Sequence, residues 1–133
     1  MSAVLKEILK TDSIIRLIGN TPLIKLNKFP GLSTDKQIFI KAEWFNPGGS
    51  IKDRAALCMI EEGIKSGRLS RDKIIMDSSS GNTAIAYAMI GAALGFEVEL
   101  VTPENINIER KKTLQAYGAK IIYSSPFEGS DGA

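Results

Sequence analysis

The sequence predicts an α/β fold, in which a parallel sheet is built from βαβ units. Four short runs rich in β-branched and other apolar residues alternate with segments of helical character. Glycines stand where the helical segments end and the chain turns toward the next strand. The 133 residues are enough for one domain with a modest core. We therefore expect a single α/β domain whose strands are joined by right-handed crossovers.

The elements follow one another in a regular order. A helix is expected over residues 3–10, followed by a turn and a short extended segment in "IGNTPLIKL". Strands are expected over residues 37–42, 73–77, 97–101 and 120–124. Helices are expected over residues 51–66, 82–94, and from "TPEN" to Tyr117, ending near Gly67, Gly95 and Gly118.

The composition excludes several classes of protein. With 44% hydrophobic and 24% charged residues, the chain is typical of a soluble globular protein. The net charge is +2, and "ERKK" (109–112) is typical of a solvated helix face, so no nucleic-acid partner is expected. The most apolar stretch, "TAIAYAMIGAALGF", is too short to span a membrane. The start of the chain lacks a signal peptide's apolar core, and one cysteine cannot form an internal disulfide, so we expect a cytoplasmic protein.

Histidine is absent from the sequence. This removes the usual general base, the usual metal ligand and any Ser-His-Asp or Cys-His arrangement. We therefore expect no metal site. Acid–base or covalent chemistry would have to use Lys, Asp, Glu, Tyr, Cys or a bound cofactor.

The stretch "NPGGSIKDRAA" (46–56) places a lysine where a helix disfavours a cation. Asn-Pro and Gly-Gly indicate a turn, and Ser50 is expected to cap a helix, with Asp53 three residues later. Lys52 then lies in the first turn, where the helix dipole disfavours an ammonium group. A surface lysine whose long stem carries its charge away is the simpler interpretation. The strand-end position and the missing histidines favour an amine that is partly buried and uncharged, ready for Schiff-base formation or proton transfer.

A second candidate loop, "SSSGNT" (78–83), follows the second predicted strand. Ligands of open parallel sheets collect at the carboxyl ends of strands, where loops lead into helix starts. Two interpretations remain equal at this point. Either Ser80 or Asn82 merely caps the following helix, or the hydroxyls and free amides bind a small anion such as a carboxylate or phosphate. For the nearby Asp53 and Arg54 we expect a cap and a structural ion pair, and for Cys58 packing in the core or on the helix flank.

Together these motifs resemble a known family. "NPGGSIKDR" with upstream "IKAEWF", preceded by "IGNTPLIKL" and followed by "SSGNTAIA", is similar to cysteine synthases and cystathionine β-synthases. These are fold-type-II pyridoxal-phosphate (PLP) enzymes with a tryptophan synthase β-subunit-like fold. The resemblance runs from about residue 14 to the C-terminus and includes "TPENINIERKKTLQAYGAKI". The Lys-Asp-Arg ending favours the β-replacement branch over the serine/threonine dehydratases.

The resemblance implies a role for each matched residue. Lys52 would form the Schiff base with the cofactor and later act as base at the substrate α-carbon. Asn82 would hydrogen-bond the cofactor ring hydroxyl, and the substrate carboxylate would be held by Ser79, Ser80 and Thr83. The implied reaction eliminates acetate from the β-carbon of O-acetylserine, an amino-acid substrate, and adds sulfide at that carbon to give L-cysteine. Cystathionine β-synthase or another β-replacement enzyme is the alternative within the same class.

Two departures from the family pattern have consequences. Ala84 stands where the family's T-S-G-N-T-G loop has its last glycine, which would add a methyl group near the cofactor. Residues 1–133 correspond to the N-terminal part of the family, without the Gly/Thr-rich loop for the cofactor phosphate. We therefore expect the chain alone to bind PLP poorly and to be inactive. The intact protein is expected to be a homodimer that could dock serine acetyltransferase, as some relatives do, whereas a truncated non-catalytic binding module is the alternative of another class.

Overall fold

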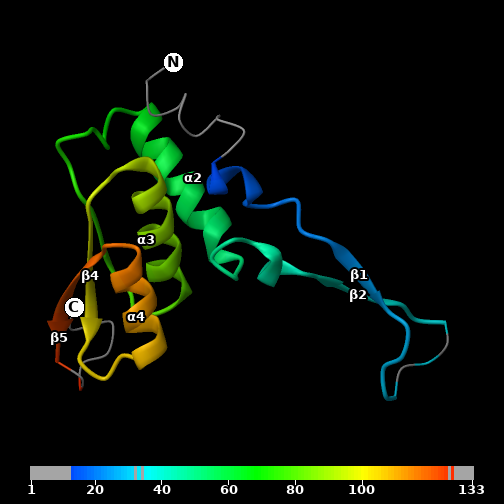
Figure 1. The fold of residues 1–133 in the computed structure, drawn as a ribbon. Coiled ribbons are helices and arrows are strands. Elements are labelled where there is room, and N and C mark those ends of the chain that lie inside the picture. The colour runs from blue at the N-terminus through cyan, green and yellow to red at the C-terminus, as the bar shows by residue number, and fades with distance from the viewer. Residues whose placement is uncertain (1–12, 32, 34, 126, 128–133) are drawn as a thin grey trace.

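The computed structural model describes residues 13–31, 33, 35–125 and 127 (Figure 1). The helix expected over residues 3–10 lies outside the described residues. In chain order the elements are η1 (Ile14–Leu17), β1 (Leu23–Leu26), β2 (Ile38–Lys41), η2 (Glu43–Phe45), α2 (Lys52–Lys65), β3 (Ile75–Ser78), α3 (Asn82–Leu94), β4 (Val98–Pro103), α4 (Ile108–Ala116) and β5 (Lys120–Ser124).

The predicted parallel sheet is present and has three strands. β4 lies in the middle and pairs in parallel with β3 and β5. The two connecting helices, α3 and α4, cover one face of this sheet (Figure 1). Along β4 every second residue, Val98, Leu100 and Thr102, is buried. The α/β class and the βαβ connections are thus confirmed.

The predicted strand over residues 37–42 forms, but its place in the parallel sheet was wrong. Residues 38–41 form β2, which pairs antiparallel with β1 in a separate two-stranded sheet, with Leu23 opposite Lys41 and Leu26 opposite Ile38. Burial alternates along β2, whereas a strand inside a parallel α/β sheet is covered on both faces. An apolar run predicts a strand, but it does not identify the partner strand, which here is set by tertiary packing.

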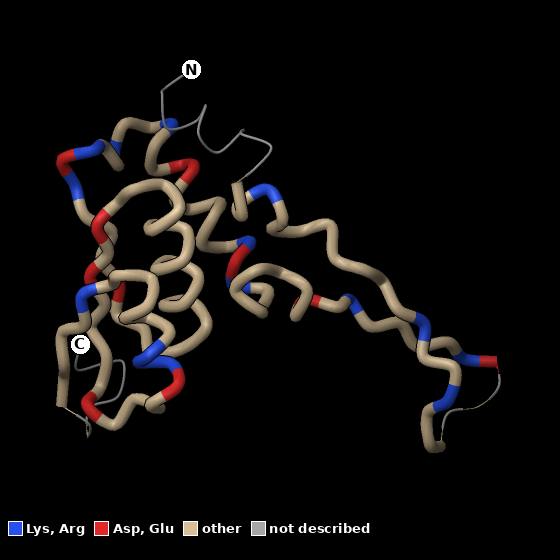
Figure 2. The backbone as a smooth tube through the Cα atoms, in the orientation of Figure 1, with Lys and Arg blue, Asp and Glu red and all other residues tan. Residues whose placement is uncertain are grey.

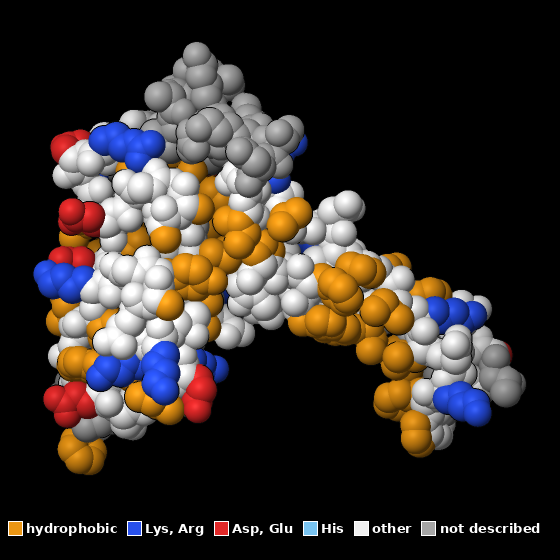
Figure 3. All heavy atoms as spheres, viewed as in Figure 1, with side chains coloured by type: hydrophobic (Ala, Val, Ile, Leu, Met, Phe, Trp, Pro, Cys, Tyr) orange, Lys and Arg blue, Asp and Glu red, His pale blue; other side chains and the backbone are white. Residues whose placement is uncertain are grey.

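The β1–β2 ribbon projects from the rest of the molecule (Figure 1). Hydrophobic side chains gather along it in the space-filling view (Figure 3), and exposed residues include Leu23, Ile24 and Phe39. An isolated two-stranded ribbon is marginally stable in water because it buries little apolar surface. The body of the molecule therefore supplies most of the burial that holds the chain folded.

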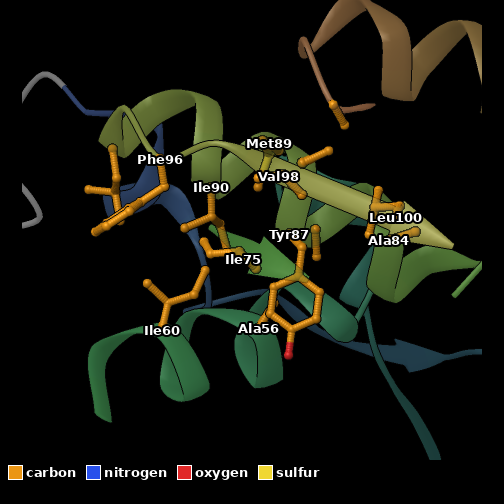
Figure 4. Close-up of a cluster of buried hydrophobic side chains, with 14 of the residues drawn as sticks. Ala56, Ile60, Ile75, Ala84, Tyr87, Met89, Ile90, Phe96, Val98 and Leu100 are labelled. Carbon is orange, nitrogen blue, oxygen red and sulfur yellow. The ribbon is translucent and has the colours of Figure 1, made fainter. Parts of the chain in front are cut away.

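The core lies between the sheet and the three α-helices. Helix α3 is its centre, with a run of buried residues from Ala86 to Gly91, as expected from its almost unbroken apolar sequence. Helix α2 packs on α3 through its buried stripe of Ala56, Ile60 and Ile64 (Figure 4). This packing fixes the direction of α2 relative to α3.

The predicted helix ends agree with the structure within about one residue. Gly67, Gly95 and Gly118 follow α2, α3 and α4, and each has a positive φ, of 73°, 70° and 77°. Glycine adopts this left-handed conformation without a Cβ clash, so the chain can leave the helix there.

Basic and acidic residues are intermixed over the body (Figure 2). Within the described ranges, no helix has both the length and the apolar character needed to cross a membrane.

Candidate functional site

The turn before α2 is built by "NPGGS", as its composition predicts. The Gly49 N–H donates to the Asn46 carbonyl at 2.8 Å, and Gly49 has a φ of 80°. Ser50 Oγ then accepts a hydrogen bond of 3.1 Å from the Lys52 N–H. The chain thereby enters α2 at Lys52, its first helical residue.

The capping box expected from Ser50 and Asp53 was wrong for Asp53. The carboxylate of Asp53 does not reach back to the Ser50 N–H; it accepts instead from the Gly48 N–H at 2.5 Å. The helix cap position falls on Ile51, whose side chain makes no cap hydrogen bond.

Lys52 is exposed, so the partial burial expected for it is not present in this chain. Its side chain has no hydrogen-bond or ion-pair partner among the described residues. The amine therefore stands free at the start of α2, where the positive end of the helix dipole lies. This geometry leaves it accessible to a ligand.

A dense polar cluster holds the turn from the other side. Arg54 binds Glu43 with two hydrogen bonds, from Nε to Oε2 at 2.8 Å and from Nη2 to Oε1 at 3.0 Å. Thr21 Oγ1 donates to Glu43 Oε1 at 3.0 Å and accepts from Arg54 Nη2 at 3.1 Å. Asn46 Nδ2 donates to Glu43 Oε2 at 2.8 Å, and Asn46 Oδ1 accepts from the Gly19 N–H at 2.8 Å. The structural ion pair expected for Arg54 is thus present.

The electrostatics of this cluster favour the ionised form of Glu43. The hydrogen bonds from Arg54, and then those from Asn46 and Thr21, lower the pKa of Glu43 from 4.5 to about 2, against an opposing effect of burial. The hydrogen bond to Glu43 in turn raises the pKa of Arg54. The sequence did not predict this cluster, because its members are far apart in the chain. One local signal was present: polar and apolar residues alternate at strand period around Lys41 and Glu43, which predicts that these two side chains point to one face. In the structure both contact Thr21.

The second candidate loop leaves the start of α3 without a side-chain cap. The Ser79 N–H donates to the Val101 carbonyl at 3.1 Å, which ties the loop to β4, and Ser79 Oγ accepts from the Gly81 N–H at 3.4 Å. The helix cap is Gly81, so neither Ser80 nor Asn82 caps α3. By contrast, α4 is capped by Asn107, whose Oδ1 accepts from two helical amides. Of the two interpretations of this loop, capping by Ser80 or Asn82 is thereby excluded.

The packing of α2 on α3 brings the two helix starts to the same end. The helices run in the same direction (Figures 1 and 4), and the Tyr87 hydroxyl donates to Met59 Sδ at 3.2 Å. From that contact back to Lys52 is seven residues, roughly 10 Å of helix, and back to Asn82 five residues, roughly 7.5 Å. The free amine and the loop of Ser79, Ser80, Asn82 and Thr83 therefore lie at one end of the helix pair.

Two other side chains near the site were considered in the sequence. Ala84 is fully buried in the core beside Leu100 (Figure 4), and the methyl group that it would add near the cofactor stays a prediction. Cys58 was expected to pack in the core or on the helix flank, yet it is exposed. The buried stripe of α2 passes through Ala56 and Ile60, and position 58 lies outside it.

Comparison with known proteins adds the decisive observation: residues 14–133 match the family described as pyridoxal-phosphate dependent enzyme. The chain belongs to this family. The resemblance stated from the motifs is confirmed, and so is the fold class, because the solved structures that match are of this kind.

Several relatives of this PLP-dependent family are similar over most of the chain. The cysteine synthase of Aquifex aeolicus (strain VF5) is 48% identical over 124 residues, which are 92% of this chain and 38% of that protein. The crystal structure of cysteine synthase from Entamoeba histolytica has a TM-score of 0.87 and 35% identity, covering 93% of this chain and 38% of that one. The O-acetylserine dependent cystathionine β-synthase from Helicobacter pylori has a TM-score of 0.86 and 33% identity, covering 94% and 41%.

The chain spans about two-fifths of the length of the first of these relatives. The residues present fit part of a PLP site. An unpartnered primary amine can bond to the aldehyde of the cofactor, and the uncapped amides of α3 can face an anionic group. A Cβ built on Gly81 would meet no atom within 4 Å, so open space adjoins this helix start.

Proposed function

We propose that this chain is the N-terminal part of a PLP-dependent β-replacement enzyme of the cysteine synthase type, which makes L-cysteine from O-acetylserine and sulfide in cysteine biosynthesis from serine. The observation that carries the proposal is the free Lys52 amine at the start of α2, which lies at the same end of the helix pair as the uncapped start of α3. The 48% identity to a cysteine synthase supports the choice of reaction. The proposal includes the part of the site that lies in residues 1–133, with the cofactor-phosphate loop outside this chain.

In this proposal the residues of the first loop supply the reacting amine. Lys52 Nζ would hold the cofactor through its aldehyde group, and the same nitrogen would accept the proton from the substrate α-carbon. The bound cofactor supplies an electron sink for the α-carbon. The Glu43–Arg54 cluster restrains the turn before Lys52, and in this proposal that turn would present the amine to the α3 loop.

The second loop binds and orients in this proposal. Asn82 would hold the ring hydroxyl of the cofactor by a hydrogen bond. Ser79, Ser80 and Thr83, together with free amides at the start of α3, bind the substrate carboxylate. The absence of a side-chain cap on α3 supports this assignment, because those amides need a partner when water is excluded.

A trapping experiment tests the role of Lys52. The chain is mixed with PLP, reduced with borohydride and digested, and the modified lysines are located by mass spectrometry. Because the chain alone is expected to bind PLP poorly, we expect only a weak Schiff-base band. Among the trapped lysines, the Lys52 peptide should carry the most cofactor, and Lys52→Ala should lose that label. Labelling spread evenly over the surface lysines, with Lys52 no more reactive than the others, would reject the assignment.

The substrate is tested on the intact protein isolated from its source, whose mass also reports its length. We expect cysteine to form from O-acetylserine and sulfide at a higher kcat/KM than cystathionine forms from serine and homocysteine. The similarity to the Helicobacter pylori cystathionine β-synthase makes that enzyme the second candidate. An isolated source protein of 133 residues that neither binds PLP nor turns over either substrate pair would favour a non-catalytic binding module.

The remaining properties of the intact protein follow from the same proposal. We infer a cytoplasmic homodimer that acts on small amino-acid substrates, with serine acetyltransferase as a candidate partner. Analytical ultracentrifugation of the intact protein, alone and mixed with serine acetyltransferase, tests the last two points. A monomer that shows no shift with the acetyltransferase would contradict both.

A further inference from the structure

A buried carboxylate stands directly beside the reactive lysine, and the site as described gives it no chemical task. Asp53 follows Lys52 in the chain, its residue is 0% exposed, and its Oδ2 accepts from the Gly48 N–H at 2.5 Å. Its other oxygen, Oδ1, is buried and has no hydrogen-bond partner in the described part of the chain. An ionised carboxylate at this position is destabilised, because burial removes its hydration and a single hydrogen bond replaces only a small part of that hydration.

The neighbouring charges do not compensate this carboxylate. Arg54 is the next residue, but its guanidinium is committed to Glu43 on the other side of the turn. Burial raises the pKa of Asp53, the Gly48 hydrogen bond opposes that shift, and the charge of Glu43 adds to it. The Gly48 amide is therefore the one favourable partner that the described residues provide for Asp53.

The geometry of Gly48 shows what this contact does. A Cβ built on Gly48 would lie 2.9 Å from Asp53 Cγ and Oδ2, and closer still to Oδ1, so the turn backbone rests directly on the carboxylate. The contact joins the residue after Lys52 to the turn four residues before it. The hydrogen bond between Gly48 and Asp53 thus spans Lys52 and restrains the backbone on both sides of it.

We propose that Asp53 is a positioning residue for Lys52: its carboxylate holds the Gly48 amide and thereby directs the lysine amine toward the α3 loop. This inference rests on the proposed function, in which Lys52 bonds to the cofactor aldehyde. It assigns no contact between Asp53 and the cofactor. The contribution of Asp53 is a hydrogen-bond acceptor at the correct place, so an amide oxygen at that place can replace it.

The experiment compares Asp53→Ala, Asp53→Asn and the control Asp72→Asn, an exposed aspartate that bonds only locally to Ser70. Each chain is mixed with PLP, reduced with borohydride and digested, and the labelling of Lys52 is divided by that of Lys112, an exposed lysine on α4. We expect Asp53→Ala to lower this ratio by at least about fivefold, since misplacing a reacting group costs rate steeply. Asp53→Asn, whose amide oxygen can accept from Gly48, and Asp72→Asn should keep the wild-type ratio.

The outcomes separate the inference from the proposed function. A wild-type ratio near one rejects the proposed function of Lys52 itself. A high wild-type ratio that Asp53→Ala leaves unchanged, with circular dichroism showing both chains folded, overturns the role of Asp53. If Asp53→Ala does not fold, Asp53→Asn decides: a folded Asp53→Asn chain that keeps the ratio supports an acceptor role, and one that loses it overturns the inference.

Discussion

The starts of α2 and α3 lie at the same end of the helix pair, yet they are built in opposite ways. At α2, the Glu43–Arg54 cluster and the Asp53–Gly48 hydrogen bond close around the turn. At α3, the cap is Gly81 without any side-chain hydrogen bond, and open space adjoins it. The closed start presents a lysine side chain, and the open start presents backbone amides.

This difference fits the two tasks that we propose. A reacting amine has to be held in one place, so its turn is fixed by side chains from several segments. An anion site needs free donors, so a helix start used for binding is left without a cap of its own. The two starts make one site only if the helices keep their packing, and each prediction below changes one part of this arrangement.

The largest expected effect comes from separating the two helices. Ile60 of α2 is 3% exposed and packs in the core against α3 (Figure 4). We expect Ile60→Ala to destabilise the fold by about 2–5 kcal/mol, because it leaves a cavity between the helices. Denaturant unfolding followed by circular dichroism measures this loss.

Ile108→Ala is the matched control for that change. Ile108 lies at the start of α4 and is 54% exposed, so its truncation should change the free energy of unfolding by less than about 0.5 kcal/mol. Equal losses for the two variants would show that the packing of α2 on α3 contributes little, and the two starts would then not be held together.

A methyl group added to each glycine gives the next largest contrast. In Gly48→Ala the new methyl meets Asp53, and we expect a loss of about 1–3 kcal/mol from overpacking. In Gly81→Ala the methyl meets open space at a φ of −106°, and we expect a loss below about 1 kcal/mol, because Ala is a poorer cap residue than Gly. Thermal unfolding of both variants measures the difference, and a Gly81→Ala loss as large as that of Gly48→Ala would contradict the open start.

Most of the fold could be predicted because its signals are local. The helix over residues 82–94 has an apolar run and a terminal glycine with a φ of 70°, and both act within a few residues. The strand that forms over residues 38–41 was predicted, over residues 37–42, from the same kind of signal. Its antiparallel pairing with β1 was not, because partner choice depends on how distant segments meet.

The site divides in the same way. The position of Lys52 in the first turn of the helix, and the glycine-rich turn before it, were predicted from residue types and spacing. The bidentate pair of Glu43 and Arg54 and the burial of Asp53 were not. Each depends on which residues from separate segments surround it, and an aspartate three residues after a serine suggests a capping box whether or not it is buried.

Acid should loosen the closed start. The pKa of Glu43 is lowered to about 2 in the folded chain from an ordinary value of 4.5, so the folded state favours its ionised form. Its stabilisation is therefore fully present above pH 4.5 and is lost as the pH falls toward 2. Thermal unfolding between pH 5 and 2 measures this loss, and Glu43→Gln should lose less stability on acidification than the wild type. Asp53 acts in the opposite direction, because its raised pKa means that the folded state favours its protonated form. The contribution of Glu43 is therefore read from the difference between the wild type and Glu43→Gln at each pH.

The smallest expected effect distinguishes a capped helix start from an open one. Asn107 caps α4 by accepting from the Glu109 and Arg110 amides at 2.9 and 3.3 Å, so Asn107→Ala should cost about 1 kcal/mol. Ser80 does not cap α3, so Ser80→Ala should change the free energy of unfolding by less than about 0.5 kcal/mol. Urea unfolding of both variants provides the comparison. If Ser80→Ala cost as much as Asn107→Ala, Ser80 would be capping α3 in solution. Its hydroxyl could then bind a substrate carboxylate only by breaking the capping hydrogen bond.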